Sequence, residues 1–185
     1  MGTILLLLLL AALAAAVFVY NSLVSLRNRV QNSWKQIDVQ LKRRHDLIPN
    51  LVDTVKGAME YERDTLQQVI DARARAVAAT GARDSGAAES TLTHSLGRLF
   101  AVMENYPALK ANENVLRLQE ELTTTENQLA FARQYYNDVV MQFNTRQQIF
   151  PANLIAGFFN FQPSEYFAGE EQDRGMPRVD LTLRT

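Results

Sequence analysis

The sequence contains no cysteine and little glycine, proline or histidine. Without cysteine there is no disulfide framework, no zinc–thiolate site and no thiol nucleophile. Only 8 glycines and 5 prolines occur among 185 residues, and long segments lack both, which favours an all-helical protein over a sheet protein with many turns. The two histidines, His45 and His94, are far apart and belong to no HExxH or Glu-x-x-His motif, so they predict no metal site.

The sequence also lacks an excess of charge of one sign. Lysine and arginine together number 19, against 20 aspartates and glutamates, whereas a nucleic-acid-binding domain is usually clearly basic. No GxGxxG motif and no Walker lysine loop is present. His45 beside Asp46 has no nucleophile nearby in the sequence, so we interpret it as a surface or capping residue. The sequence predicts no enzyme, no cofactor, no metal, no small-molecule substrate and no nucleic-acid partner.

What the chain does have is a long apolar N-terminal segment. Residues 1–26 carry no charged side chain. As a helix, residues 3–26 would be about 36 Å long, enough for a hydrocarbon core of roughly 30 Å. A cleaved signal peptide is the alternative, but the basic n-region of such peptides is missing. We predict a transmembrane anchor over residues 1–26, with membrane-facing side chains that include Leu5, Leu8, Leu13, Phe18 and the interfacial Tyr20.

The charges that flank this segment predict its orientation. Arg27, Arg29 and Lys35 follow it before the first acidic residue, Asp38. By the positive-inside rule the N-terminus lies outside and residues 27–167 form a cytoplasmic domain. Arg27 and Arg29 are also placed to meet lipid headgroups.

Helical periodicity continues beyond the apolar segment. Apolar residues recur every three or four positions up to Leu41, so the anchor should continue directly into a soluble helix. Pro49 disfavours helix at the residue before it, and it predicts a helix boundary, either a kink or a reversal. The second helix should then run to about Thr80.

The rest of the chain reads as two more helices and a tail. Residues 81–87 have the composition of a loop, and a shorter helix through Leu92 and Met103 should stop before Pro107. Asn112 can cap a fourth helix over residues 113–148, which shows a long pattern of three- and four-residue spacing typical of packing against partner helices. We expect residues 168–185, which are polar and interrupted by glycine and proline, to form a flexible tail.

Several charged side chains fall on apolar stripes. Glu62 and Arg73 lie on the stripe of the second helix, and buried charges must be paired. Glu126 and Arg133 of the fourth helix are the candidate partners in a buried polar network; alternatively, the long side chains reach solvent from the edge of the stripe. We interpret Lys42, Arg43 and Arg44 as a solvated helix end, with contact to an acidic partner surface as the alternative.

Residues 149–161 are apolar, aromatic and uncharged. In an up-down bundle they follow four helix crossings, so they should lie at the end next to the membrane. They could cover that end as a lid, or they could form an interface with the bilayer or a neighbouring subunit. The candidate interface residues are Phe150, Leu154, Phe158, Phe159 and Phe161.

Many short blocks together resemble the LemA family of bacterial membrane proteins. They include Trp34 with DVQLKRRHDLIPNLV, the DARA of residues 71–74, ENYPALKAN, LQEELTTTEN, AFARQYYN and FPANLIAGFF, in this order. The resemblance implies an all-α fold, with one N-terminal transmembrane helix continuing into an antiparallel four-helix bundle, and it favours a reversal at Pro49. It also implies a bacterial inner-membrane protein, and it brings no assigned catalytic mechanism.

These observations predict a non-enzymatic, membrane-anchored scaffold or assembly protein. Its partners would be the lipid bilayer and either further copies of the chain or another membrane protein. The alternative is an adaptor or regulator of a membrane protease or signalling protein. A cryptic enzyme is a further possibility, for which the sequence offers no constellation of polar groups.

Overall fold

A computed structural model describes residues 1–167, and every residue of regular secondary structure in that range is helical. The predicted all-α class is therefore confirmed. The predicted flexible tail, residues 168–185, lies outside the described residues. In chain order the helices are α1 (Gly2–Val55), α2 (Arg63–Ala78), α3 (Ala82–Met103), α4 (Pro107–Lys110), α5 (Glu113–Gln148) and α6 (Ala152–Phe158).

Helix α1 is a single helix of 54 residues, about 80 Å long. It passes residue 26 without a break, as the sequence predicts. It also continues through Pro49, so the helix boundary predicted there is wrong, and so is the reversal that the family resemblance favours. The chain reverses in residues 56–62 instead, where Met59 is fully buried and holds the turn against the core. The second helix accordingly starts at Arg63, and it is shorter than predicted.

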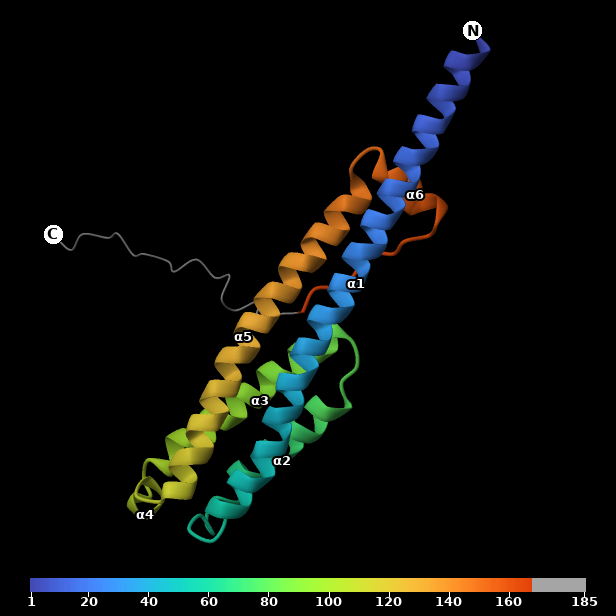
Figure 1. Cartoon of the computed structure of the whole chain (residues 1–185). Coiled ribbons are helices and arrows are strands. Elements are labelled where there is room, and N and C mark those ends of the chain that lie inside the picture. Colours follow the sequence, from blue (N-terminus) through green and yellow to red (C-terminus); the bar gives the residue numbers. More distant parts are fainter. Residues whose placement is uncertain (168–185) are drawn as a thin grey trace, which may run out of the picture.

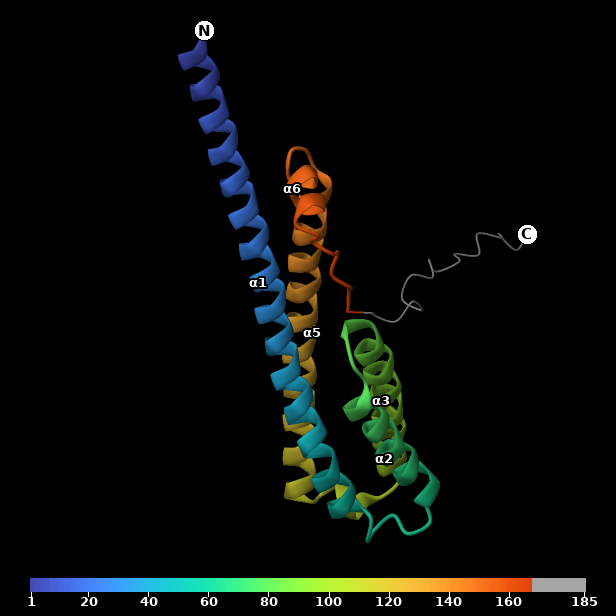
Figure 2. The same ribbon diagram turned by 90° about the vertical axis from the view of Figure 1, so that its right-hand side faces the viewer.

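Helices α1 and α5 lie side by side and antiparallel, and the α2–α3 hairpin packs beside the half of this pair that is distant from the N-terminus (Figures 1 and 2). Four long helices therefore run together only in the distal half. The chain leaves the N-terminal end in α1, returns in α2, leaves in α3 and returns in α5. The N-terminal part of α1 extends alone beyond α5 and α6 (Figure 1).

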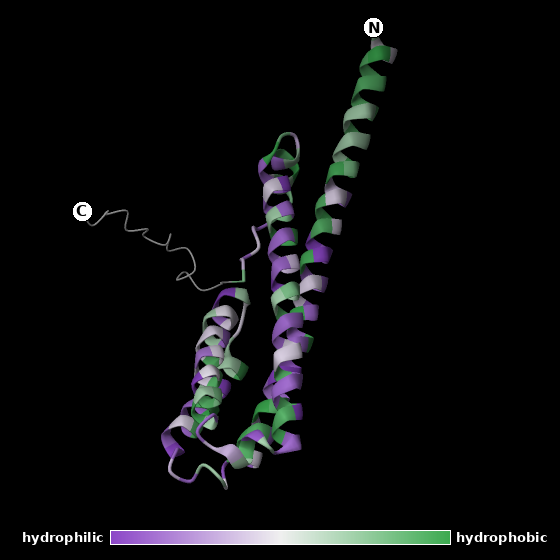
Figure 3. Cartoon of the chain, turned by 90° about the vertical axis from the view of Figure 1, so that its left-hand side faces the viewer, coloured by the Kyte–Doolittle hydropathy of each residue, from purple (hydrophilic) through white to green (hydrophobic). Residues whose placement is uncertain are grey.

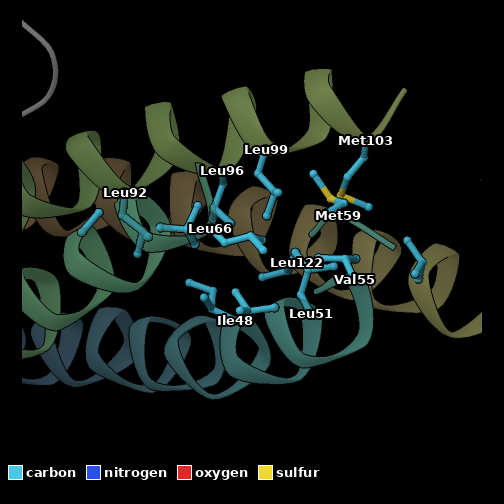
Figure 4. Packing of buried hydrophobic residues seen from close by; sticks show 14 of the residues in the cluster. Ile48, Leu51, Val55, Met59, Leu66, Leu92, Leu96, Leu99, Met103 and Leu122 are labelled. Carbon is cyan, nitrogen blue, oxygen red and sulfur yellow. The ribbon is translucent and has the colours of Figure 1, made fainter. Parts of the chain in front are cut away.

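The distal core joins all four long helices. Its members include Ile48 and Leu51 of α1, Leu66 of α2, Leu99 of α3 and Leu122 of α5 (Figure 4). Burying each such leucine or isoleucine stabilises the fold by about 1.5–3 kcal/mol. This core holds the hairpin against the α1–α5 pair, and it gives the distal half its cohesion.

Two smaller cores follow toward the N-terminus. The middle core joins α1 and α5, for example through Ile37, Val140 and Phe143, and Phe167 covers it. The last core joins α1 to α6 through Val19, Leu23, Ala152 and Ala156. Together the three clusters form one continuous line along the buried face of α1.

Two local predictions have different outcomes. Asn112 caps α5 as predicted, because its side-chain oxygen accepts hydrogen bonds from the backbone N–H groups of Asn114 and Val115. The predicted loop over residues 81–87 is wrong, since α3 begins at Ala82. Only Gly81 has a loop conformation there, with φ of 83°, a value that glycine adopts without strain. Ala82, the first residue of α3, is buried in the middle core.

Candidate functional site

A layer of buried charged side chains lies between the distal and middle cores. Arg44 and His45 of α1 are buried, with Arg44 only 3% exposed, and they sit between the core residues Leu41 and Ile48. Glu89 of α3 is 1% exposed and meets both of them. Arg44 Nη1 donates to Glu89 Oε2 at 2.8 Å, and His45 Nε2 lies 2.5 Å from Glu89 Oε1. One carboxylate thus joins α3 to two successive residues of α1.

Helix α5 completes the layer with charges of both signs. Arg44 Nη2 donates to the Thr93 hydroxyl at 2.8 Å and forms an ion pair with Glu126 Oε2 at 3.0 Å. Glu126 Oε1 lies 3.5 Å from Arg133 Nη1. Arg44 and Glu89 are buried, whereas the Glu126 and Arg133 side chains are 34% and 23% exposed. The two arginines and two glutamates balance one another, which the buried Arg44–Glu89 pair requires. The layer therefore ties α1, α3 and α5 together at one level of the bundle.

Arg133 lies at the edge of this layer under a phenyl ring. Its guanidinium carbon is 4.9 Å from the centre of the Phe167 ring. Within residues 1–167, no hydrogen-bond acceptor reaches its Nε or Nη2 atom. Burial lowers the pKa of the Arg133 guanidinium, although the Glu126 carboxylate acts in the opposite direction. Cation–π contact and the Glu126 carboxylate therefore stabilise a cation that has lost most of its water.

Arg73 of α2 compensates for the defect that Pro49 introduces into α1. Proline has no backbone N–H, so the carbonyl four residues earlier, on His45, loses its usual helical donor. Arg73 Nε donates to that His45 carbonyl oxygen at 2.7 Å. The side chain of one helix thus satisfies a backbone group that the other helix leaves unpaired. This contact explains why α1 can continue through Pro49.

The structure divides the four residues of the predicted polar network. Glu126 and Arg133 do meet in the charged layer. Arg73 instead binds the His45 carbonyl, and Glu62 is partly exposed and accepts a hydrogen bond from the Tyr106 hydroxyl at 3.2 Å. The predicted pairing of Glu62 and Arg73 with Glu126 and Arg133 is therefore absent from the described contacts.

The sequence does not predict the central members of the layer. It predicts Arg44 at a solvated helix end and His45 as a surface or capping residue, but both are buried. The sequence does hold a signal, because Leu41, Arg44 and Ile48 share the three- and four-residue spacing of one helix face. Glu89 similarly lies three residues before Leu92 in the buried stripe of α3.

A cavity of about 520 Å³ lies beside the charged layer, between α1, α2 and the start of α3. Its polar lining includes Lys42, His45, Asp46, Arg73 and Ser85. Nowhere in residues 1–167 do three metal-ligating side chains come together. His45 and Arg73 are already engaged by Glu89 and by a backbone carbonyl, so the arrangement serves to hold helices in register.

The end of the bundle nearest the apolar segment carries an aromatic cluster. Tyr20 of α1 lies 4.6 Å from Phe159 and 5.9 Å from Phe161 between ring centres. Arg27 lies over the Phe161 ring at 5.3 Å, while Arg29 is exposed. Of the predicted interface residues, Phe161 is partly buried and packs against the middle and last cores.

The other predicted interface residues are exposed. They are Phe150, Leu154, Phe158 and Phe159. The lid alternative is therefore met only in part. Ala152, Ile155 and Ala156 pack against α1, whereas Phe150, Leu154 and Phe158 face outward.

A strap of extended chain follows α6 and returns along α5. Asn144 bonds both the N–H and the carbonyl of Ser164, each at 2.9 Å. Asn137, two turns away, makes the same pair of bonds to Phe167. The Tyr136 hydroxyl donates to the Glu165 carbonyl at 2.8 Å. This strap places Phe167 over Arg133 and the middle core, and sequence periodicity gave no sign of it.

The predicted anchor residues lie on the part of α1 that stands alone. Leu5, Leu8, Leu13 and Phe18 are exposed, and Tyr20 is partly buried against the aromatic cluster. This part of α1 is apolar all round (Figure 3). Its length and composition suit a membrane-spanning helix, the one such helix in the described part of the chain. A helix apolar on every side is typical of a membrane span.

Comparisons with known proteins agree with these features. The family model described as "LemA family" matches residues 33–181. The magnetosome proteins MamQ 1 and MamQ 2 of Paramagnetospirillum magneticum are each 24% identical over 183 residues, covering 85% of this chain and 67% of those proteins. Protein LemA of Metamycoplasma hominis is 25% identical over 162 residues, covering 85% of this chain and 74% of that protein.

Proposed function

Because the chain belongs to the LemA family, we propose that it is a non-enzymatic, membrane-anchored helical scaffold that assembles with further copies of itself. It resides in the inner membrane of a bacterium, with the N-terminus outside and the bundle in the cytoplasm. Arg27, Arg29 and Lys35, which follow the apolar segment before any acidic residue, support this orientation. The relatives that are magnetosome proteins support a membrane-associated role.

A groove between α1 and α5 is the observation that carries the assembly role. It has a volume of about 620 Å³ and includes Val39, Phe131 and Tyr135. These side chains are 62%, 74% and 49% exposed, respectively. The groove uses the opposite face of α1 from the cavity beside His45, so the α2–α3 hairpin does not cover it. Such uncovered apolar grooves commonly receive another protein.

A second copy of the chain is the occupant that the geometry favours. The anchor holds every copy in the same orientation, so the groove of each copy lies at the same height above the bilayer. A two-fold axis along the membrane normal then brings groove against groove, as a self-complementary interface requires. The lining carries a single charged side chain, Lys35. Little like-charge repulsion therefore opposes the contact.

The test measures the mass of the full-length protein purified in a mild native detergent. The wild type should be an oligomer without other proteins. The double variant Phe131→Asp with Tyr135→Asp should be a monomer, because it places carboxylates in the groove. Val77→Asp is the matched control: Val77 is 56% exposed on α2, outside the groove, and its variant should remain oligomeric.

Two results would contradict this proposal, the first the scaffold role and the second the groove as its interface. A monomeric wild type that copurifies with one dominant protein, lost in the Phe131→Asp and Tyr135→Asp variant, would instead identify an adaptor or regulator. An oligomer that survives both aspartates would show that assembly does not use this groove.

A further inference from the structure

Helix α6 has one face covered by α1 and one face that nothing in residues 1–167 covers. Ala152 and Ala156 pack against α1 and are 1% and 5% exposed. On the outer side Leu154 and Phe158 are 62% and 83% exposed, and Phe150, in the turn just before the helix, is 78% exposed. Two phenyl rings and a leucine side chain so close together form an exposed apolar patch, which is unfavourable in water. Such a patch indicates that this face contacts a membrane or another protein.

The position of α6 along α1 indicates that this contact is with the membrane. The core between α1 and α6 contains Val19 and Leu23. A hydrocarbon core of roughly 30 Å takes about 20 helical residues, and residues 3–22 are such a stretch, ending in the polar residues Asn21 and Ser22. Helix α6 therefore packs against the last turn of the span, at the boundary between acyl chains and headgroups.

The charges around α6 are those expected beneath an anionic lipid surface. No charged side chain occurs in residues 147–164. Residues 1–37 and 139–164, which form this end of the bundle and part of the middle core, contain Arg27, Arg29, Lys35 and Arg146 and no acidic residue. Arg27 lies five residues beyond Ser22, about 7 Å further along the helix, at the depth of headgroup phosphates. Helices α1 and α5 thus supply the cations that α6 itself lacks.

We propose that α6 is a second membrane contact, whose outer face is inserted among the lipids of the leaflet on the bundle side. Phe150, Leu154 and Phe158 enter the acyl boundary, while Arg27 and Arg29 bind anionic headgroups just beneath. The inference rests on the membrane-anchored state in the proposed function, and it is independent of self-assembly. The contact fixes the rotation of α1 about its own axis, because the side that carries α6 must face the interface.

The experiment reads the depth of single tryptophans in the full-length protein. Trp34 is the one tryptophan of the chain, so a Trp34→Phe background carries Phe158→Trp, Phe18→Trp or Tyr61→Trp. Each protein is reconstituted at a high lipid-to-protein ratio in vesicles that contain phosphatidylglycerol and lipids brominated on the acyl chain near the headgroup. Tyr61, 95% exposed in the distal turn, is the aqueous control, and Phe18 within the span is the inserted control.

We expect the brominated lipids to quench Phe158→Trp several-fold more strongly than Tyr61→Trp, with a blue-shifted emission for Phe158→Trp. Quenching of Phe18→Trp but not of Phe158→Trp would overturn the inference and leave the anchored scaffold intact. If Phe158→Trp is blue-shifted without quenching, and the shift is lost on dilution with lipid, α6 packs against a second copy and the inference is wrong. Absence of quenching at Phe18→Trp would overturn the anchor and the inference together.

Discussion

Arg73 donates a hydrogen bond to the His45 carbonyl. The stability lost on changing Arg73 should therefore depend on Pro49, which lies 24 positions earlier. Arg73→Ala removes the donor that replaces the missing N–H of Pro49. When Pro49 is present, Arg73→Ala leaves the His45 carbonyl without a hydrogen-bond partner inside the bundle. In a Pro49→Ala background the alanine N–H can bond that carbonyl, so Arg73 should matter little. The effects of the two substitutions should therefore be strongly non-additive.

The size of the effect follows from the kind of hydrogen bond. A bond from a charged donor contributes about 1.5–3 kcal/mol. Arg73 is only partly buried, so we expect the lower half of this range, and Arg73→Ala should lower the unfolding free energy by about 1.5–2 kcal/mol. In the Pro49→Ala background the loss should shrink to about 0.5 kcal/mol, which is the scale of surface substitutions. The coupling energy is then about 1–1.5 kcal/mol.

The assay is urea unfolding of the full-length protein in detergent micelles, followed by circular dichroism and by Trp34 fluorescence. All four proteins of the double-mutant cycle are compared, and equal m-values are required. Arg75, an exposed neighbour on α2, provides the control: Arg75→Ala should lose the same small amount in both backgrounds. If Arg73→Ala lowers the unfolding free energy equally in the wild type and in the Pro49→Ala background, Arg73 does not replace the missing Pro49 N–H and the reasoning is refuted.

Further predictions concern the charged layer, a buried phenol and the orientation. Glu89→Ala should lower the unfolding free energy by about 3–5 kcal/mol, because it leaves buried cations unpaired, whereas Asp53→Ala at an exposed site should change it by less than about 0.5 kcal/mol; equal losses would show that the layer is not buried in solution. Burial, and secondarily Glu165, raises the pKa of Tyr136 above 10.0, so its stabilising contribution is complete below pH 10 and is lost as pH rises through the folded pKa. Tyr136→Phe should therefore flatten the alkaline decline in unfolding free energy, and an unchanged slope would contradict this. In intact cells, a cysteine introduced at Gly2 should react with an impermeant thiol reagent and one introduced at Arg83 should not; the reverse pattern would refute the orientation.

Sequence periodicity predicted those parts of the fold that depend on local physics. The Asn112 cap and the extent of α5 followed from a capping side chain and an unbroken apolar stripe. The helix boundary predicted at Pro49 is wrong because the donor that replaces the missing proline N–H is Arg73, 28 residues beyond His45. Nothing near Pro49 in the sequence indicates that donor.

The charged layer was only half predictable for a similar reason. Glu126 and Arg133 lie seven residues apart, two turns along the same face of one helix, so their long side chains can meet. Arg44 and Glu89 are 45 residues apart on different helices. The apolar stripe on which each lies can indicate its burial, but it does not indicate which charge it meets. Only the register of α3 against α1 makes them partners, and that register comes from packing in the distal core.

The unbroken course of α1 through Pro49 has a mechanical consequence. Between Ser22 and Val55 the helix is about 50 Å long, and it is stiffened by α5 along much of that length (Figure 2). If residues 3–22 span a bilayer, the stiff helix from Ser22 to Val55 tilts by the same angle as the span. A typical tilt of about 20° displaces its far tip sideways by about 17 Å. A thinner bilayer increases that tilt, so the reversal at residues 56–62 would swing outward as the membrane thins.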